Sequence, residues 1–460
     1  MLSPPAGSGA GRAIVVGPYL RTHQAGAETN RGEQAQRSPQ ARLDEAVGLA
    51  RAIDLSVVHA GVVTLATVRP ATYLGKGKVD EIAGLGKSLE AGLVVMDCAL
   101  SPVQQRNLEK AWNAKVIDRT GLILEIFGRR AATREGALQV ELAHLTYQRS
   151  RLVRSWTHLE RQRGGFGFLG GPGETQLEAD RRIIAQRIAR IERELEGVKR
   201  TRGLHRKSRK RVPYPIVALV GYTNAGKSTL FNRLTKAAVL STDMLFATLD
   251  PTLRAVDLPH GARVILSDTV GFISDLPTML VAAFRATLEE VIEADLILHV
   301  RDVSHGDTQA QSLDVERVLN ELGIAPEDNR IIEVWNKIDR LDAAERERLD
   351  NLAKRQPPER RPMLVSAASG EGVDALIAAI EARIVQSRVT LTVDLDAAEG
   401  AALSWLHRHA EVLDQATTEE GRTAVRIRID PTKEGIVRGK FGARIRAEPE
   451  RGAIKAAHGA

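Results

Sequence analysis

The pattern of apolar and polar positions changes several times along the 460-residue chain and divides it into five segments. Residues 1–40 are rich in Gly, Pro, Ser, Gln and Arg, so we expect a largely mobile N-terminal segment. Its one apolar run, Ile14-Val15-Val16, is a candidate strand that would have to pair with a neighbouring element.

Residues 41–135 alternate short apolar runs with amphipathic stretches. The apolar runs have the length of strands, and the stretches between them have the spacing of helices. Such alternation predicts a small N-terminal α/β domain with a mainly parallel sheet. The candidate strands are 62–68, 93–96 and 115–118, and the candidate helices are 41–52, 78–90 and 102–113.

Residues 136–212 have the spacing of a coiled coil, because apolar side chains recur every three or four positions on both sides of a glycine-rich stretch. We therefore predict an antiparallel hairpin of two helices, each about 25 residues and about 37 Å long. The seam positions are Leu138, Leu142, Leu145, Arg149, Leu152, Trp156 and Leu159 in the first arm, and Leu177, Ile184, Ile188, Ile191, Leu195 and Val198 in the second.

The predicted loop between the arms, residues 163–174, holds more glycine than a turn needs, together with two phenylalanines and a leucine. An apolar, glycine-rich tip on a long arm favours a probe that enters a partner. The alternative is a tip folded back onto its own protein. The candidate contact residues in this tip are Gly164, Gly165, Phe166, Phe168, Gly171, Pro172 and Gly173.

The second arm runs into a stretch, residues 199–211, that contains no acidic side chain. The formal net charge of +7 would by itself be weak evidence for an anionic partner, but here the cations are clustered. Such a cluster displaces counterions from a phosphate backbone and binds it in a salt-dependent way. The candidate RNA contacts are Arg200, Arg202, Arg206, Lys207, Arg209, Lys210 and Arg211.

Residues 213–387 contain a phosphate-binding motif between an apolar strand and a helix. The spacing GxxxxGKS in this context is typical of a P-loop. Backbone N–H groups and the helix N-terminus would hold the phosphates, Lys227 would reach the β- and γ-phosphates, and Ser228 would ligate Mg²⁺. The candidate nucleotide-binding residues here are Gly221, Tyr222, Thr223, Asn224, Ala225, Gly226, Lys227, Ser228 and Thr229.

Three further motifs follow predicted strands in the order that a guanine-nucleotide site requires. In Asp268-Thr269-Val270-Gly271, Asp268 would hold Mg²⁺ through water and the Gly271 N–H would contact the γ-phosphate. In Asn336-Lys337-Ile338-Asp339, the Asp339 carboxylate would accept two guanine N–H groups that adenine lacks. The backbone of Ser366-Ala367-Ala368 would meet the guanine oxygen. GTP is therefore the predicted nucleotide.

The segment 245–252 contains two threonines, one of which we expect to bind Mg²⁺ and the γ-phosphate only in the GTP state. Thr248 is favoured and Thr252 is the alternative. Directly after Gly271 stands Phe272, where signalling GTPases of the Ras type have a glutamine that orients water. We expect slow intrinsic turnover that a partner accelerates. The catalytic candidates are Lys227, Thr248 and Gly271.

The remaining residues, 388–460, show alternating strand-like runs around one helix and predict a small C-terminal α+β domain. The single cysteine, Cys98, lies in an apolar run and is better explained as a buried hydrophobe than as a nucleophile. No run approaches the roughly 18 apolar residues of a membrane span, and no secretory signal is evident. We expect a cytosolic protein.

Several long stretches resemble the HflX family of translation-associated GTPases. They are Thr72-Tyr73-Leu74-Gly75-Lys76-Gly77-Lys78, residues 100–108, residues 117–127 with Arg134-Glu135-Gly136, and Gly171-Pro172-Gly173-Glu174 with the residues up to Arg182. The resemblance implies a factor that docks on the large ribosomal subunit and its rRNA, splits stalled ribosomes when bound to GTP, and is stimulated by them. Through ribosomes, part of it would be found at membranes.

Two features bear on that resemblance. Gly170 stands where family members often have Arg before the tip motif, so that contact is lost or supplied elsewhere. The resemblance also implies weak ATP binding by the N-terminal domain, for which Gly75-Lys76-Gly77-Lys78 is the candidate, although it lacks P-loop spacing.

Two alternatives to ribosome splitting stay open. One is an RNA-binding assembly GTPase whose cycle times its release, and the other is an RNA-modifying enzyme with an attached G domain. Against the latter, no thiol or metal-ligand constellation is evident outside the G domain. We expect a monomer with Mg²⁺ as its cofactor and GTP or GDP as its nucleotide.

Overall fold

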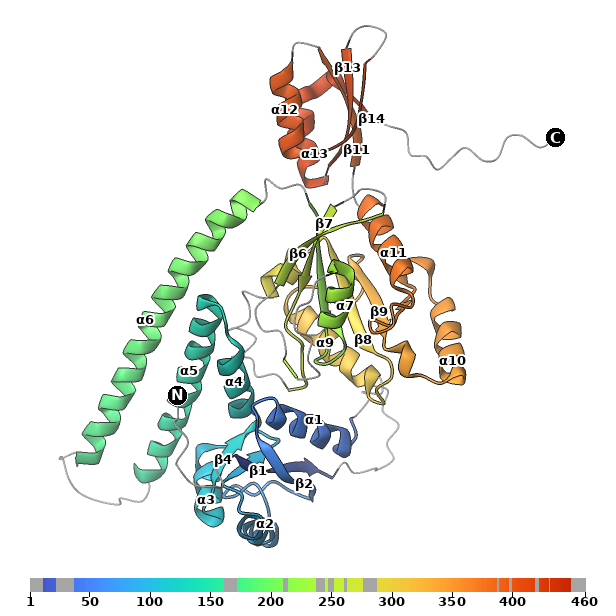
Figure 1. Ribbon diagram of the computed structural model, residues 1–460. Helices are drawn as coiled ribbons and strands as arrows, with labels where there is room; N and C mark the ends of the chain where they lie inside the picture. The colour runs from blue at the N-terminus through green and yellow to red at the C-terminus, as the bar shows by residue number, and fades with distance from the viewer. Residues whose placement is uncertain are drawn as a thin grey trace, which may run out of the picture.

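The computed structural model describes residues 11–21, 37–160, 172–209, 214–236, 245–246, 252–259, 263–275, 288–386, 389–396, 399–417, 422–429 and 431–447. Their strands form three sheets, each in a region of its own, and a long helical hairpin stands beside them (Figure 1). This arrangement confirms the predicted class, an α/β protein with a hairpin and a terminal α+β domain. No helix in the described ranges is both long enough and apolar enough to cross a membrane.

The N-terminal domain has a parallel four-stranded sheet in the order β2-β1-β3-β4. The candidate strand at Ile14 is part of β1, which lies between β2 and β3 and is almost wholly buried. The candidate strand is therefore confirmed, and it extends beyond the expected residues 14–16 on both sides. The strands are β1 (Arg12–Leu20), β2 (Ser56–Leu65), β3 (Leu93–Met96) and β4 (Lys115–Asp118), and the helices are α1 (Pro39–Arg51), α2 (Lys76–Ser88), α3 (Pro102–Trp112) and α4 (Arg119–Arg130).

Strand β2 begins six residues before the predicted run and ends at Leu65. It is an edge strand beside β1, so most of its side chains are exposed or half-buried, and its first six residues do not form a continuous apolar run. The helices of this domain start where side chains cap them. The hydroxyl of Ser101 and the amide of Gln104 form a capping box at α3, and the Asp118 carboxylate accepts from the Gly121 N–H at α4.

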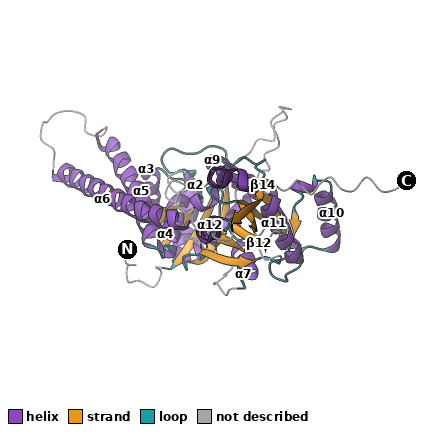
Figure 2. Ribbon diagram, turned by 90° about the horizontal axis from the view of Figure 1, so that it is seen from above, coloured by secondary structure: helices purple, strands orange, loops and turns teal. Residues whose placement is uncertain are grey.

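The hairpin consists of α5 (Arg134–Glu160) and α6 (Pro172–Arg209), which lie side by side in two views (Figures 1 and 2). The predicted seam is present where Leu145 packs among Ile188, Ile191 and Leu195. Two predicted limits were wrong. Helix α6 starts at Pro172, inside the predicted loop, because proline suits the first turn of a helix. It also continues into the basic stretch as far as Arg209, since Arg and Lys are good helix formers.

The G domain has a six-stranded sheet in the order β10-β9-β8-β5-β7-β6, parallel except for the edge strand β6. The parallel strands β5, β7, β8 and β9 end at the same edge, where the nucleotide motifs begin. The strands are β5 (Ile216–Gly221), β6 (Thr252–Asp257), β7 (Arg263–Asp268), β8 (Leu296–Asp302), β9 (Ile331–Asn336) and β10 (Met363–Leu364). The helices are α7 (Lys227–Thr235), α9 (Thr308–Glu321), α10 (Ala343–Lys354) and α11 (Val373–Gln386), with short turns at Ile338–Arg340 and Pro358–Arg360.

The C-terminal domain is an antiparallel sheet in the order β12-β13-β11-β14, with helices against one face, as predicted. Leu391, Val393, Val425 and Ile427 alternate along β11 and β13 and are fully buried against the helices. The elements are β11 (Val389–Asp396), α12 (Gly400–His409), β12 (Glu411–Thr417), β13 (Arg422–Ile429), α13 (Pro431–Phe441), a short turn (Gly442–Arg444) and β14 (Ile445–Ala447).

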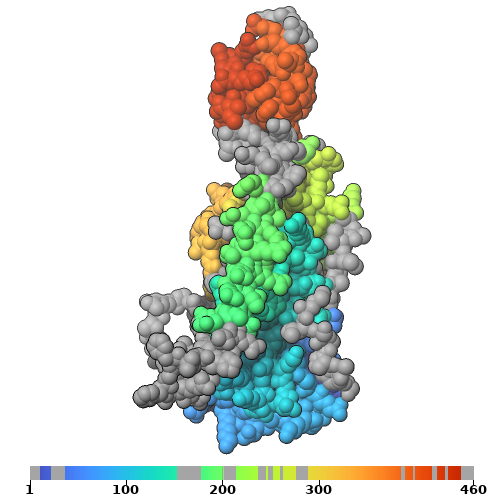
Figure 3. Space-filling model, turned by 90° about the vertical axis from the view of Figure 1, so that its left-hand side faces the viewer, coloured from blue at the N-terminus to red at the C-terminus, as the bar shows by residue number. Residues whose placement is uncertain are grey.

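One hydrophobic core is shared by the N-terminal and G domains. Leu49 of α1 and Phe127 of α4 belong to the same buried cluster as Phe246 and Phe272. The rings of Phe127 and Phe246 meet edge to face with their centroids 4.7 Å apart. On another face, the surface of α6 extends alongside this body toward the C-terminal domain (Figure 3). The shared core holds the two domains as a single unit at the edge that carries the nucleotide loops.

Candidate nucleotide site

The P-loop passes so close to its neighbours that glycine is required at two of its positions. Gly221 has φ of 153°, and a Cβ there would lie 2.2 Å from the carbonyl oxygen of Val300. Gly226 has φ of 89°, and its Cβ would lie 2.2 Å from Nδ2 of Asn336. Both conformations belong to glycine, and both gaps exclude a side chain. The loop thereby brings its backbone N–H groups to the start of α7, as a phosphate cradle needs.

Lys227 lies at the first position of α7 and is buried. Its ammonium donates hydrogen bonds to the carbonyl oxygens of Gly221, at 3.1 Å, and Tyr222, at 2.7 Å. Burial lowers the pKa of Lys227 to about 8, against the opposing effect of Asp268. The ammonium thus lies inside the P-loop, where the phosphates were expected to bind.

Oxygen ligands for a cation meet at the other side of the loop. The Ser228 hydroxyl donates to Oδ2 of Asp268 over 2.7 Å, and Asp268 is buried at the end of β7. Hydroxyl and carboxylate oxygens suit Mg²⁺, so these residues fit the expected metal. The adjacent Thr269 hydroxyl donates to the backbone of Leu219 and is turned away from them. Thr248 lies outside the described residues, and Thr252 is the first residue of β6, opposite Asp268 in the ladder.

The motifs expected to bind the base are joined by direct hydrogen bonds. Asn336 donates from Nδ2 to the carbonyl of Ala225 in the P-loop, at 2.8 Å, and its Oδ1 accepts from the Ala367 N–H, at 2.9 Å. The Ser366 hydroxyl donates to Asp339 over 2.6 Å. The Lys337 ammonium forms an ion pair with Asp302, with 2.7 Å between nitrogen and oxygen. Arg233 donates to the carbonyls of Ala367 and Ala368.

Phe272 has a role that its sequence position did not reveal. Its backbone forms a bridge with the P-loop, in which its N–H donates to Gly221 at 3.1 Å and its carbonyl accepts from Thr223 at 2.7 Å. The side chain is 1% exposed and lies in the core shared with the N-terminal domain. This ring therefore ties the segment after Gly271 to the domain interface, and its chemistry offers no hydrogen bond to water.

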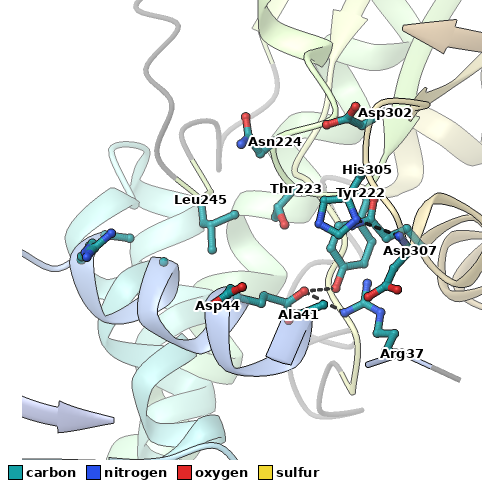
Figure 4. A pocket seen from close by; sticks show the side chains of 15 residues that line it. Arg37, Ala41, Asp44, Tyr222, Thr223, Asn224, Leu245, Asp302, His305 and Asp307 are labelled. Carbon is teal, nitrogen blue, oxygen red and sulfur yellow. Dashed lines mark hydrogen bonds and ion pairs between the residues drawn. The ribbon is translucent and has the colours of Figure 1, made fainter. Parts of the chain in front are cut away.

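A cavity of about 420 Å³ opens between α1 and the first half of the P-loop (Figure 4). Figure 4 shows the Tyr222 ring beside Arg37, with Asp44 and Ala41 of α1 on the other side. Sequence reasoning missed the contribution of α1, because its side chains carry no motif. The lining residues are Arg37, Ala41, Asp44, Glu45, Gly48, Arg51, Ala52, Tyr222, Thr223, Asn224, Leu245, Asp302, His305, Asp307 and Gln311.

Sequence reasoning also missed the polar residues that join the two domains, namely Glu45, Arg119 and Ser274. The sequence did contain a signal that could have pointed to Arg119. Asp97 directly follows β3 and Asp118 ends β4, and the carboxyl ends of parallel strands are where functional side chains collect. Arg119 stands next to one of these acids and forms a buried ion pair with the other, Asp97, over 2.5 Å.

The predicted partner-contact residues are only partly described. Of the tip, residues 164–171 lie outside the described ranges, and Pro172 and Gly173 form the first positions of α6. Within the basic stretch, Arg200 is exposed on α6, Arg202, Arg206, Lys207 and Arg209 belong to the same helix, and residues 210–211 lie outside the described ranges. In the N-terminal domain, Gly75 caps α2, and Lys78 forms an exposed ion pair with Glu81.

Comparison with family models matches nearly the whole chain in four consecutive pieces. Residues 40–128 match "GTP-binding GTPase N-terminal" and residues 130–209 match "GTP-binding GTPase Middle Region". Residues 216–337 match "50S ribosome-binding GTPase", and residues 351–450 match "HflX C-terminal domain". The order of the pieces follows the order of the domains in the structure.

Similar proteins align with this chain over most of their own length. The chain is 50% identical to GTPase HflX of Magnetococcus marinus over 398 residues, which cover 86% of this chain and 90% of the relative. It is 46% identical to GTPase HflX of Escherichia coli, over 78% of this chain and 83% of the relative. A solved structure of a GTP-binding protein from Sulfolobus solfataricus in complex with GDP is 22% identical, covers 81% of this chain and 99% of its own, and has a TM-score of 0.44.

Proposed function

This chain belongs to the HflX family of GTPases, and we propose that it binds the large ribosomal subunit and uses its GTP cycle to split or rescue stalled ribosomes. The observation that carries the proposal is the pairing of a GTPase region similar to 50S ribosome-binding GTPases with a long hairpin beside the G domain. Helix α6 of that hairpin presents Arg181, Arg182, Arg187 and Arg200 to solvent.

Within the G domain, the nucleotide would be held by side chains whose positions the loops already determine. The Lys227 ammonium would exchange its hydrogen bonds to the backbone carbonyls of Gly221 and Tyr222 for contacts with the phosphates. The Asp339 carboxylate would exchange the Ser366 hydroxyl for the guanine N–H groups. Ser228 and Asp268 would hold Mg²⁺, Asp268 through water, together with Thr248 in the GTP state. When bound, the metal neutralises charge that develops on the phosphate oxygens.

Hydrolysis would need help from the bound partner. The side chain directly after Gly271 is a buried phenyl ring, so it neither orients water nor stabilises charge at the γ-phosphate. Lys227 and the Gly271 N–H remain to stabilise the transferred phosphate. We propose that the ribosome supplies or repositions the missing polar group, and that hydrolysis then releases the factor.

The test is GTP turnover by the full chain with and without large ribosomal subunits, at 50 mM and 200 mM salt. Turnover should rise strongly with subunits, and this stimulation should fade at the higher salt, because phosphate contacts weaken as counterions compete. An equal, slow rate in every condition would contradict ribosome-activated hydrolysis.

A second assay separates splitting from the alternative of an assembly GTPase. Assembled ribosomes would be mixed with the protein and a non-hydrolysable GTP analogue, and then resolved by sedimentation. Dissociation into subunits supports a splitting factor. Intact ribosomes, together with binding to immature large particles, would favour the assembly GTPase.

A further inference from the structure

The P-loop and the segment after Gly271 are joined across the domain boundary by one carboxylate. Glu45 projects from α1, and its Oε2 accepts a hydrogen bond from the Tyr222 hydroxyl of the P-loop. Its Oε1 accepts from the Ser274 hydroxyl at 3.2 Å. The Tyr222 oxygen in turn accepts from the Ser274 N–H at 2.8 Å. Three groups from two domains thus form one closed ring of hydrogen bonds.

Two guanidinium groups hold this carboxylate in place. Arg119 forms an ion pair with Glu45 and also donates to the Ser274 carbonyl at 3.0 Å. Arg37 donates to Glu45 at 2.8 Å, and its guanidinium lies 4.6 Å from the centre of the Tyr222 ring (Figure 4). Burial acts to raise the pKa of Glu45, but the two cations outweigh it and keep the pKa below its ordinary value. Glu45 is therefore a charged, largely buried and fixed group.

The other nucleotide-sensing segment rests on the same domain. Phe246, which precedes the candidate metal ligand Thr248, packs edge to face on Phe127 of α4. Gly48 of α1 faces Leu245 so closely that a Cβ at Gly48 would lie 3.0 Å from the leucine. Leu245 and Phe246 thus contact α1 and α4, and Ser274 contacts Glu45 of α1. Both segments expected to respond to the γ-phosphate therefore pack against the N-terminal domain as well as the G domain.

We propose that Glu45, held by Arg119, is a positioning residue for GTP hydrolysis: from the N-terminal domain it sets residues 271–274 against the P-loop. Gly271 is three residues before Ser274, and its backbone is already confined, since a Cβ there would lie 3.0 Å from the Lys227 ammonium. A shift of Ser274 would carry the Gly271 N–H away from the γ-phosphate. The inference depends on the GTPase activity of the family and not on the proposed action on ribosomes.

The experiment compares steady-state GTP hydrolysis by the full chain without ribosomes in the variants Glu45→Gln and Tyr222→Phe. For each variant, kcat expressed per nucleotide-binding site should be about tenfold lower than for the unmodified chain. The Kd of each variant for a fluorescent GDP analogue should stay within about twofold of the Kd of the unmodified chain. The double variant should be no slower than the slower single variant, because both changes act on the same ring of hydrogen bonds. A merely structural contact would lower the unfolding temperature without changing kcat per binding site.

Glu81→Gln is the matched control, because it makes the same chemical change on α2 of the same domain, where the Glu81 carboxylate is exposed and pairs with Lys78. Its kcat should stay within twofold. If Glu45→Gln does not fold, Tyr222→Phe removes only one hydroxyl and decides the matter. A kcat that is unchanged or raised in Tyr222→Phe would overturn the proposal, whatever the ribosome assays show.

Discussion

At Lys227, burial of the side chain opposes the charge that its expected function requires. Its ammonium is enclosed by the P-loop, where burial lowers its pKa to about 8, although the chemistry expected of it requires the positive charge. Bound phosphates would restore the higher pKa, because the charged form is then compensated. Nucleotide binding is therefore linked to proton uptake at Lys227 in the alkaline range.

This linkage predicts that GDP affinity is greatest below pH 8 and falls as the pH rises from 7 to 9. The sign follows from the lowered pKa: the free protein loses the Lys227 proton above pH 8, and must regain it to bind phosphate. Fluorescence titration with a GDP analogue at constant ionic strength measures the effect. Lys227→Arg stays charged throughout, so its weaker binding should not depend on pH in this range. The same pH dependence in both proteins would rule out Lys227 as the titrating group.

Helix α5 is attached to the N-terminal domain through a buried acid. Asp118 accepts from the Tyr147 hydroxyl at 2.5 Å and from the Arg151 guanidinium at 2.6 Å, and it is 2% exposed. Both donors come from α5, one helical turn apart. Because Asp118 directly precedes Arg119, the residue that anchors the arm adjoins the residue that holds Glu45.

Arg151→Met should loosen this arm. Removing one member of a buried ion pair leaves the other charge uncompensated, which costs about 3–5 kcal/mol. Hydrogen exchange along α5 should accelerate, and the unfolding temperature should fall. Arg149 was expected at a seam position but is exposed on the same helix, two positions away. Arg149→Met is therefore the control and should change neither. Equal effects of the two substitutions would show that Asp118 does not anchor the arm.

At the level of the whole molecule, the shared core makes the N-terminal and G domains one folding unit. Phe127 is 1% exposed, and its neighbours in the buried cluster come from both domains. A domain boundary crossed by such a core differs from the boundary at the C-terminal domain, whose buried residues form a cluster of their own. We expect calorimetry to show one joint transition for the first two domains.

Phe127→Ala should divide that transition in two. Truncation of a buried phenylalanine costs about 3–5 kcal/mol, and here the loss falls on contacts between domains. Phe231→Ala removes an equally buried ring whose cluster lies inside the G domain, so it should lower the transition temperature without splitting it. A single transition in Phe127→Ala would mean that the remaining interface is sufficient to couple the domains.

The local elements and the nucleotide motifs were accessible from the sequence because each depends on neighbours in the chain. A P-loop needs a strand, eight consecutive residues and a helix start, and the structure has β5, the loop and α7 in that order. The hairpin seam follows from a spacing of three and four residues. The limits of α6 were wrong because proline and basic residues, judged by composition, resembled a loop and a linker.

The contacts between domains were decided by the folded chain alone. Glu45 and Ser274 are 229 positions apart, and nothing in either neighbourhood indicates that they meet. The central place of β1 in its sheet is of the same kind, since it depends on pairing with strands that begin at Ser56 and Leu93. Such contacts follow from the packing of whole elements, which sums many weak interactions over the molecule and leaves no short pattern in the sequence.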